Sequence, residues 1–280
     1  MFKSPFGNLS VRGLSFCPKL LREQSDMSMI QLHNEGKIAT LTIHRPEALN
    51  ALNSALLDEL SKVVQELSTN QEISVLIITG EDRSFVAGAD IAEMAQYTPE
   101  EALSFARKGA SLFRKIELLP QVVIASINGF CLGGGCELAM ACDLRIASEK
   151  AKMGQPETGL GIPPGFGGTQ RLPRLVGIER AKELIFSSRI IRADEALAIG
   201  LISKVVPHDE LMSQTMALAQ SIAAQSPSAL RLAKDAINRG IQSDIDTALS
   251  IENDLFALAF ASPEQKEGMS AFLEKRRPQF

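Results

Sequence analysis

The sequence predicts an α/β fold followed by a region made only of helices. Up to about residue 207, apolar runs of strand length alternate with amphipathic segments of helix length. From there to the end, only segments with helical spacing follow, as is common in packing or assembly regions. We therefore divide the chain into an N-terminal extension over residues 1–26, an α/β core over residues 27–207 and a helical oligomerisation region over residues 208–280.

The extension over residues 1–26 shows neither strand nor helix periodicity, and four basic residues precede its first acid, Glu23. Three explanations fit: a translation start placed upstream of Met27 or Met29, a disordered tail, or an organellar transit peptide. We favour the first two together and expect the extension to be disordered.

The core begins with a strand, a helix and a second strand. Residues 37–44 alternate between apolar and polar side chains, which predicts a strand. Asn50 or Asn53 can cap a helix whose apolar residues recur at helical spacing to about residue 68. Residues 73–80 are almost continuously apolar, as expected for a strand covered on both faces.

A second helix and strand follow the same order. Thr98, Pro99 and Glu101 supply an N-cap, a first-turn proline and a capping-box acid for a helix that reaches about residue 118. Residues 122–127 then read as the next strand.

After the central glycine-rich part of the chain, the pattern turns mainly helical. Residues 171–207 predict a helix, a shorter helix ended by Gly200 and a last strand that ends at Pro207. Four helices should complete the chain, over residues 209–225, 226–240, 244–261 and 264–275.

Composition excludes several classes of partner. The formal net charge is −4 and there is no long basic run, so we expect neither nucleic acid nor an anionic membrane as partner. Every apolar run is interrupted well before the ~20 residues of a membrane helix. With 45% hydrophobic and 22% charged residues, the composition is that of a soluble globular protein.

The cysteines and histidines do not predict a metal site. Three histidines are scattered, and the four cysteines lack the C-x-x-C spacing. Cys131, Cys136 and Cys142 lie in apolar or glycine-rich stretches, which favours small buried side chains in a reducing compartment.

The segment over residues 122–170 holds the features that suggest chemistry. Gly133, Gly134 and Gly135 precede a helix, whose first N–H groups and positive dipole end favour an oxygen with partial negative charge. The absence of side chains lets a carbonyl come close. The best candidate for a second donor is the AGAD loop over residues 87–90.

Two glutamates accompany these glycines. Glu137 follows Gly134 by three residues, and Glu157 lies at the end of a further predicted strand, before a Gly/Pro-rich loop. Each has an ordinary explanation, as an acid that complements the helix dipole or as a solvated loop acid. Together, on either side of a polarised carbonyl, one can take a proton from water and the other can protonate carbon. The GLGIPPG run lacks the glycine spacing of a dinucleotide site.

Six motifs resemble the enoyl-CoA hydratase/isomerase, or crotonase, family over residues 29–280. The motifs are RPEALNAL (45–52), FVAGADI (85–91), NGFCLGGGCELAMACDLRIAS (128–148), GQPETGLGIPPGFGGTQRL (154–172), ADEALAIGLISKVV (193–206) and EGMSAFLEKRRPQF (267–280). The resemblance implies a crotonase-like α/β spiral of ββα turns with a C-terminal helical trimerisation region, assembled as a homotrimer or a homohexamer. It implies an acyl-CoA substrate and no cofactor, since coenzyme A is part of the substrate.

The resemblance also assigns roles. The Ala89 and Gly134 amides would form an oxyanion hole, Glu137 would activate water for attack at C3, and Glu157 would protonate C2. The expected substrate-binding residues are Ala87, Gly88, Asp90, Ile91 and Gly165, of which Gly165 shapes the water and acid side of the site. Since both acid positions are glutamate, the resemblance favours reversible syn hydration of a short-chain trans-2-enoyl-CoA to the (S)-3-hydroxyacyl-CoA.

A Δ3,Δ2-enoyl-CoA isomerase is the alternative enzyme, because one carboxylate can move a proton between two carbons. An RNA-binding relative is disfavoured by the missing basic surface. We expect a cytoplasmic protein, or a mitochondrial one if residues 1–26 are a transit peptide. The chain departs from the family pattern at Glu47, where relatives often have a basic residue, and at Pro163–Pro164, where one proline is usual.

Overall fold

The computed structural model describes residues 28–280, so the expectation for residues 1–26 lies outside the described residues. A six-stranded sheet forms the centre of the molecule, in the order β1-β2-β3-β5-β7-β10. The β1–β2 pair is antiparallel and every other pair is parallel. Its strands are β1 (Ile30–Glu35), β2 (Ile38–Ile43), β3 (Val75–Gly80), β5 (Val122–Ile127), β7 (Leu144–Ser148) and β10 (Lys204–Val206). The predicted strands at 37–44, 73–80 and 122–127 are confirmed.

A smaller four-stranded sheet has the order β4-β6-β8-β9. Its strands are β4 (Ser84–Val86), β6 (Phe130–Leu132), β8 (Lys152–Gly154) and β9 (Ile191–Arg192). The chain passes from β3 to β4, from β5 to β6 and from β7 to β8, and a helical segment follows each pair. Every pass therefore adds one strand to each sheet, and the predicted spiral of ββα turns is confirmed.

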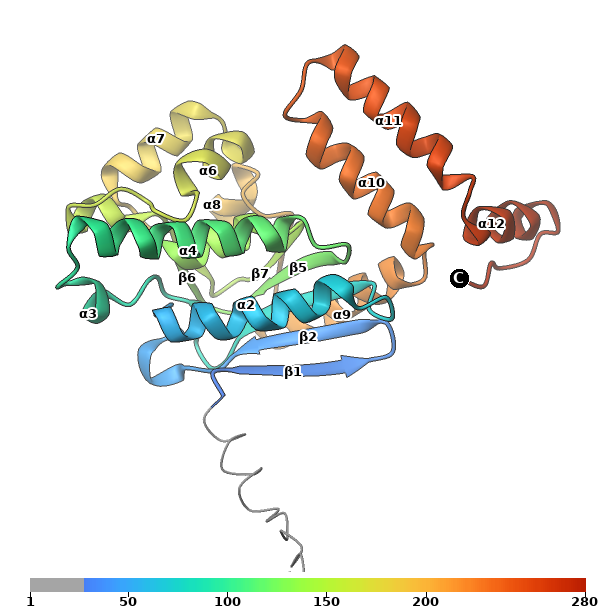
Figure 1. Cartoon of the computed structure of the whole chain (residues 1–280). Helices are drawn as coiled ribbons and strands as arrows, with labels where there is room; N and C mark the ends of the chain where they lie inside the picture. The colour runs from blue at the N-terminus through green and yellow to red at the C-terminus, as the bar shows by residue number, and fades with distance from the viewer. Residues whose placement is uncertain (1–27) are drawn as a thin grey trace, which may run out of the picture.

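Local capping signals fix the first long helices. In α2 (Ser54–Thr69), the Asn53 side chain accepts a hydrogen bond from the Leu56 N–H, so Asn53 rather than Asn50 is the cap. In α4 (Pro99–Glu117), Thr98 and Glu101 form the predicted capping box. Both helices bury an apolar stripe and lie side by side in Figure 1.

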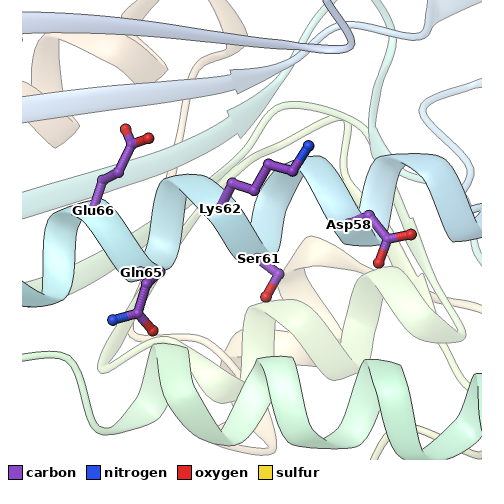
Figure 2. Close-up of a pocket in the computed structure, with 5 residues that line it drawn as sticks. All are labelled: Asp58, Ser61, Lys62, Gln65 and Glu66. Atoms are coloured by element: carbon purple, nitrogen blue, oxygen red, sulfur yellow. The ribbon is translucent and has the colours of Figure 1, made fainter.

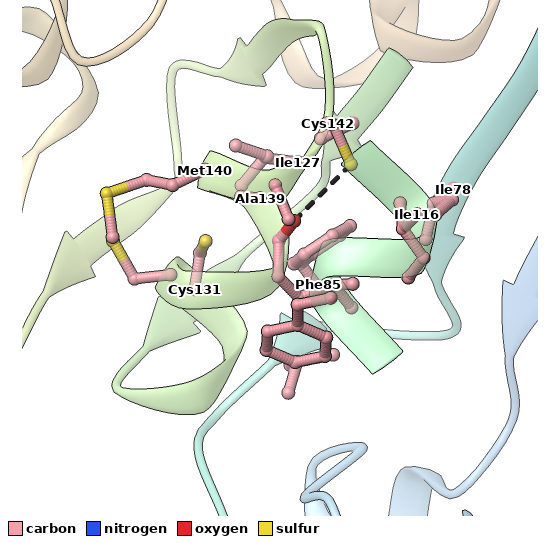
Figure 3. Close-up of a cluster of buried hydrophobic side chains, with 14 of the residues drawn as sticks. Ile78, Phe85, Ile116, Ile127, Cys131, Ala139, Met140 and Cys142 are labelled. Atoms are coloured by element: carbon pink, nitrogen blue, oxygen red, sulfur yellow. Dashed lines mark hydrogen bonds between the residues drawn. The ribbon is translucent and has the colours of Figure 1, made fainter. Parts of the chain in front are cut away.

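The main core fills the space between the sheets and helices. Phe85 of β4, Ile116 of α4 and Ala139 of α5 (Gly134–Ala141) meet there (Figure 3).

The three described cysteines are free and buried, as expected. Burial raises the pKa of the Cys142 thiol to about 12, and its Sγ donates a hydrogen bond to the Leu138 carbonyl. These thiols are packing groups rather than nucleophiles.

Two predictions about the elements were wrong. The single helix expected after residue 171 is two helices, α6 (Gly168–Val176) and α7 (Ile178–Ser187). Gly177 separates them with a φ of 86°, which ends the first helix. The strands β1, β4, β6 and β9 were not predicted, because β1 buries only its first residue and the others span two or three residues.

After β10 the chain is helical to its last turn, as predicted. Between β9 and β10, α8 (Ala193–Ala198) is the short helix that Gly200 follows. Leu211 and Ala219 of α9 pack against the large sheet, whereas α10, α11 and α12 extend away from it (Figure 1). No helix in residues 28–280 is both long and apolar enough to cross a membrane. The C-terminal helices are α9 (Leu211–Ala223), α10 (Pro227–Gly240), α11 (Ile245–Ala259) and α12 (Pro263–Leu273).

Candidate active site

A cavity of ≈ 450 Å³ opens at one edge of the small sheet. The parallel strands β4, β6 and β8 all end at this edge, and the segment after each strand contributes to the cavity wall. This is where α/β proteins usually bind ligands. Its walls comprise the loop after β4, α4, the start of α5 and the segment after β8. The lining residues that carry the argument below are Ala89, Gly134, Glu137, Glu157, Phe105 and Phe166.

The Gly134 N–H is free at the start of α5. Gly133 adopts a φ of 49°, and its own N–H donates to the Gly154 carbonyl at 2.9 Å. Gly134 is the first helical residue, and among residues 28–280 its N–H finds no acceptor. A helix terminus that faces a cavity with a free N–H can receive a carbonyl oxygen.

A second free N–H belongs to Ala89. The Leu52 N–H donates to the Gly88 carbonyl at 2.9 Å, and the Asp90 N–H donates to the Leu52 carbonyl at 2.8 Å. This parallel bridge turns the Ala89 N–H away from Leu52, and no acceptor in the described part of the chain takes it. The loop lies close to α5, because a Cβ built on Gly133 would be 3.8 Å from the Gly88 Cα.

Glu137 is buried and held through one oxygen. Its Oε1 accepts hydrogen bonds from the Phe166 N–H at 2.8 Å and the Gly168 N–H at 2.6 Å. Within residues 28–280, its Oε2 accepts none. Burial raises the pKa of Glu137, whereas the two N–H groups and the positive charge of Arg171 oppose that rise. The carboxylate therefore has a fixed orientation and one oxygen available.

Glu157 has no such support. It lies in a 3₁₀ turn (Pro156–Leu160) directly after β8, and neither carboxyl oxygen finds a partner in the part of the chain that the structure describes. Burial and then the negative charge of Glu137 raise the pKa of Glu157 to about 7. Hydrogen bonds thus hold the carboxyl group of Glu137, whereas Glu157, with a pKa of about 7, is partly protonated near neutral pH.

The structure brings most of the predicted substrate-binding residues together. Ala87, Gly88, Ile91 and Gly165 line the cavity, as do Ala89 and Gly134. Asp90 does not line it. Its Oδ2 pairs with Arg45 at 2.7 Å, and its Oδ1 caps α3 (Ile91–Met94) by accepting from the Ala92 and Glu93 N–H groups. A substrate role for Asp90 stays a prediction, and its contacts favour support of the loop.

Sequence reasoning missed the groups that hold Glu137. The Phe166 and Gly168 amides come from a loop 29 and 31 residues further along the chain. Gly167 is the N-cap of α6 and Gly168 is its first residue, which repeats the glycine pattern at the start of α5. That repetition was the available signal for a second anion-holding helix terminus.

The two departures from the family pattern lie in different places. Glu47 is exposed, and its nearest cationic partner is Arg45 at 3.6 Å. Pro163 and Pro164 both line the cavity and stiffen its wall.

A second hollow, on the exposed face of α2, lacks the features of a site. Its polar side chains diverge from one another, as Figure 2 shows for Lys62 and Gln65. In residues 28–280, no three His, Cys, Asp or Glu side chains gather as metal ligands.

The fold and the cavity define an α/β protein whose site combines free main-chain donors with a pair of unequal carboxyl groups. A sequence model described as enoyl-CoA hydratase/isomerase matches residues 33–280. The short-chain-enoyl-CoA hydratase of Clostridium acetobutylicum is 53% identical over 253 residues, covering 90% of this chain and 97% of its own. The crotonyl-CoA hydratase of Syntrophomonas wolfei is 54% identical, with the same coverage.

Solved structures agree with these matches. The enoyl-CoA hydratase from Bacillus anthracis is 41% identical, and the two structures superpose with a TM-score of 0.88 over 90% of this chain and 99% of that one. The chain belongs to the enoyl-CoA hydratase/isomerase family.

Proposed function

We propose that this protein hydrates short-chain trans-2-enoyl-CoA thioesters to (S)-3-hydroxyacyl-CoA. The observation that carries the proposal is a pair of glutamates in one cavity, one held by two N–H groups and one without a partner in residues 28–280, beside two main-chain N–H groups that find no acceptor there. The names of the relatives from Clostridium acetobutylicum and Syntrophomonas wolfei support the same chemistry.

In the proposed reaction, the thioester carbonyl oxygen accepts hydrogen bonds from the Ala89 and Gly134 N–H groups. These bonds stabilise the negative charge that develops on the oxygen and make C3 electrophilic. Glu137 takes a proton from water through its free oxygen, and the water oxygen adds to C3. Glu157 gives its proton to C2. Exchange with solvent then restores a carboxylate at Glu137 and an acid at Glu157.

Substitution of each glutamate tests these roles. Glu137→Gln and Glu157→Gln each remove one proton-transfer group with little change in size, so kcat for crotonyl-CoA hydration should fall about 10²–10⁴-fold. Loss of absorbance of the enoyl thioester measures the rate. Near-wild-type hydration by Glu157→Gln would refute its assignment as the proton donor.

The same variants separate hydration from isomerisation. An isomerase needs one carboxyl group to move a proton between two carbons. In that case one of the two glutamine substitutions would abolish conversion of a 3-enoyl-CoA, and the other would leave that conversion unchanged. A hydratase should instead act on 2-enoyl-CoA and lose activity with either substitution.

The preference for a short acyl chain is inferred from two stiff parts of the cavity wall. Phe105 and Phe166 line it with their ring centroids 5.2 Å apart, and Pro163 and Pro164 stiffen another wall. Rigid rings and prolines leave little space for a long tail. Rates across a series of enoyl-CoA chain lengths test this point, and a maximum at eight or more carbons would contradict it.

Self-association and a cytoplasmic location complete the proposal. The helices α10, α11 and α12 extend from the body and expose large apolar side chains, including Ile241 at 79% and Phe272 at 82%. A second copy of the chain is the proposed cover, giving a homotrimer or a homohexamer. The bacterial relatives support the cytoplasm as the location.

A further inference from the structure

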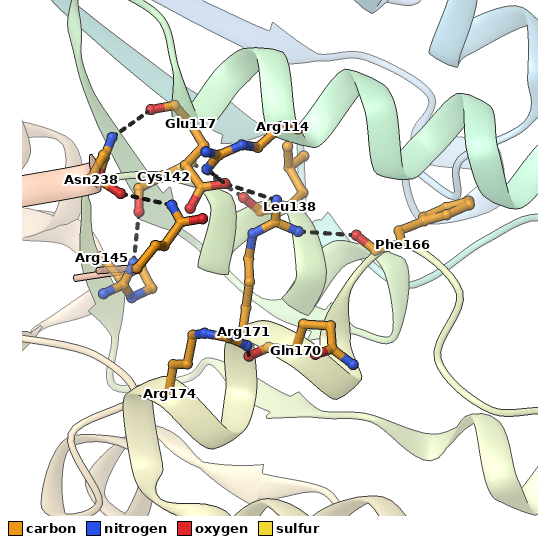
Figure 4. A network of polar contacts seen from close by, with 11 residues as sticks. Arg114, Glu117, Leu138, Cys142, Arg145, Phe166, Gln170, Arg171, Arg174 and Asn238 are labelled. Carbon is orange, nitrogen blue, oxygen red and sulfur yellow. Dashed lines mark hydrogen bonds and ion pairs between the residues drawn. The ribbon is translucent and has the colours of Figure 1, made fainter. Parts of the chain in front are cut away.

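Arg171 connects the loop that holds Glu137 to the end of helix α4. It lies in α6, and its Nη1 donates a hydrogen bond to the Phe166 carbonyl at 3.1 Å. Its Nη2 donates to the Glu117 Oε2 at 3.0 Å (Figure 4). The side chain is only 15% exposed, so both contacts are shielded from water. A guanidinium with two fixed partners is a rigid clamp.

The clamp acts on the residue that binds Glu137. The Phe166 N–H donates to the Glu137 Oε1, and the Phe166 carbonyl accepts from Arg171. The ring of Phe166 is also confined, because a Cβ on Gly109 or Gly134 would lie 2.4 or 3.2 Å from its atoms. Phe166 is therefore fixed through its N–H, its carbonyl and its ring.

The shape of the loop and the position of the guanidinium depend on each other. Gly167 has a φ of 109°, and a Cβ built there would lie 2.3 Å from the Arg171 Nη1. The guanidinium thus occupies the space that any side chain at residue 167 would need. This arrangement presents the Phe166 and Gly168 N–H groups to the same carboxylate oxygen.

Glu117 is a firm anchor for Arg171. Its Oε2 also accepts from the Arg114 Nη1 at 2.8 Å, and its main-chain carbonyl accepts from the Asn238 side chain of α10 at 3.1 Å. The end of α4 is thereby fixed by two guanidinium groups and by helix α10.

We propose that Arg171 is a positioning residue for hydration, which holds residues 166–168 so that their amides keep the Glu137 carboxylate in its productive orientation. This inference rests on the proposed hydratase activity. A loosened loop would let the carboxylate rotate and misalign the attacking water, and misplacement of about 1 Å can cost about 100-fold in rate.

Four variants test the inference. Arg171→Gln removes the charge and the clamp, Arg171→Lys keeps the charge, and Glu117→Gln removes the negative charge that anchors Arg171. Arg174→Gln is the matched control, because Arg174 lies on the same helix, is exposed and donates only to the Gln170 carbonyl within that helix.

Arg171→Gln should lower kcat for crotonyl-CoA about 100-fold while KM changes less than about threefold, since orientation rather than binding is lost. Glu117→Gln and Arg171→Lys should each lower kcat about tenfold, and Arg174→Gln should stay within about twofold of the unmodified enzyme.

The pH dependence of kcat distinguishes positioning from a merely structural role. The charged groups that face Glu137 are Glu157 and Arg171. Removal of the Arg171 charge disfavours the carboxylate, so the acid limb should move to higher pH in Arg171→Gln and stay in place in Arg171→Lys.

The inference is overturned if folded Arg171→Gln keeps kcat within about threefold of the unmodified enzyme and its acid limb does not move. If that variant does not fold, Arg171→Lys and Glu117→Gln decide by the same kcat criterion. If the unmodified enzyme itself does not hydrate crotonyl-CoA, the proposed function fails, which is a separate result.

Discussion

Glu137 and Glu157 are the same side chain in two environments within one cavity. Two main-chain N–H groups bind Glu137 and favour its charged form, whereas Glu157 is buried without a partner among residues 28–280 and faces the negative charge of Glu137. Burial raises the pKa of both carboxyl groups, and hydrogen bonds from the neighbouring loop oppose that rise at Glu137. This inequality lets one cavity both remove and donate a proton.

The unsupported burial of Glu157 should lower stability at high pH. Its pKa rises from 4.5 to about 7 on folding, so the folded state binds the proton more tightly than the unfolded state does. Stability then decreases as the pH rises from about 4.5 to about 7, by ~3 kcal/mol in total. Glu157→Gln carries no such cost, so its stability advantage should grow between pH 5 and pH 8.

Urea unfolding of both proteins at the two pH values, at one protein concentration, measures this difference. Glu66→Gln, on the exposed face of α2, is the control and should give the same small effect at both pH values. An advantage of Glu157→Gln that stays constant from pH 5 to pH 8 would contradict the assigned pKa.

The residue-scale predictions from sequence succeeded where the cause is local. Asn53 and Thr98 cap helices through bonds that span three residues, and such bonds leave a signature in the sequence. The contacts of Glu137 with Phe166 and of Arg171 with Glu117 span 29 and 54 residues. Nothing in a local pattern specifies them, because they depend on how the spiral stacks its turns.

At the scale of elements, helix α5 rests directly on strand β4. A Cβ at Gly135 would lie 2.0 Å from the Val86 carbonyl oxygen and 2.7 Å from the Val86 Cβ. Helix and strand are thus in contact through their main chains. This close approach brings the loop after β4, which carries Ala89, up to the start of α5, which carries Gly134.

Gly135→Ala should therefore destabilise the protein strongly. The new methyl group meets a main-chain atom that cannot rotate away, and overpacking of this kind costs ~1–3 kcal/mol or more. Gly165→Ala is the control, because its Cβ would meet only the Ala106 Cβ at 3.8 Å, an ordinary contact. Thermal unfolding compares the two, and equal midpoints would show that α5 can move away from β4.

The long elements of the core were predictable because a buried helix or strand of six or more residues shows its own periodicity; β1 was not, since it buries only its first residue. Most of the small sheet was not predictable, although the site is built on it; only the strand that leads to Glu157, which corresponds to β8, was predicted. Strands β4, β6 and β8 have three residues each and exist because the preceding long strands place them side by side. The family resemblance supplied the spiral that periodicity alone did not.

At the scale of the whole molecule, exposed apolar side chains are unequally distributed between the spiral and the C-terminal helices. The spiral buries most of its large apolar side chains, with exceptions such as Phe186 of α7. The segment from α10 to α12 leaves many of its own exposed, among them Ile237, Ile241, Ile245, Phe256 and Phe272. Lys234 of α10 nevertheless ties the arm to the body through Asp143 at 2.7 Å. These helices are held to the spiral and still expose apolar side chains, so they are suited to contact another copy of the chain.

Light scattering after size exclusion should give a mass of three or six times 30.3 kDa. The double substitution Ile241→Asp and Phe272→Asp places charges on the proposed contact surface, where burial of an unpaired charge is costly, so the mass should fall to that of a monomer. Leu32→Asp, on the large sheet, should leave the mass unchanged. An unmodified protein that runs as a monomer would rule out the assembly.

The free donors at Ala89 and Gly134 are main-chain groups, so exchanging a side chain does not remove them, except for proline. The fold itself therefore supplies the groups that polarise a carbonyl, whereas a single substitution removes either proton-transfer group. In such a scaffold, new reactions are expected to arise by replacement of the carboxyl groups around a constant oxygen-binding site.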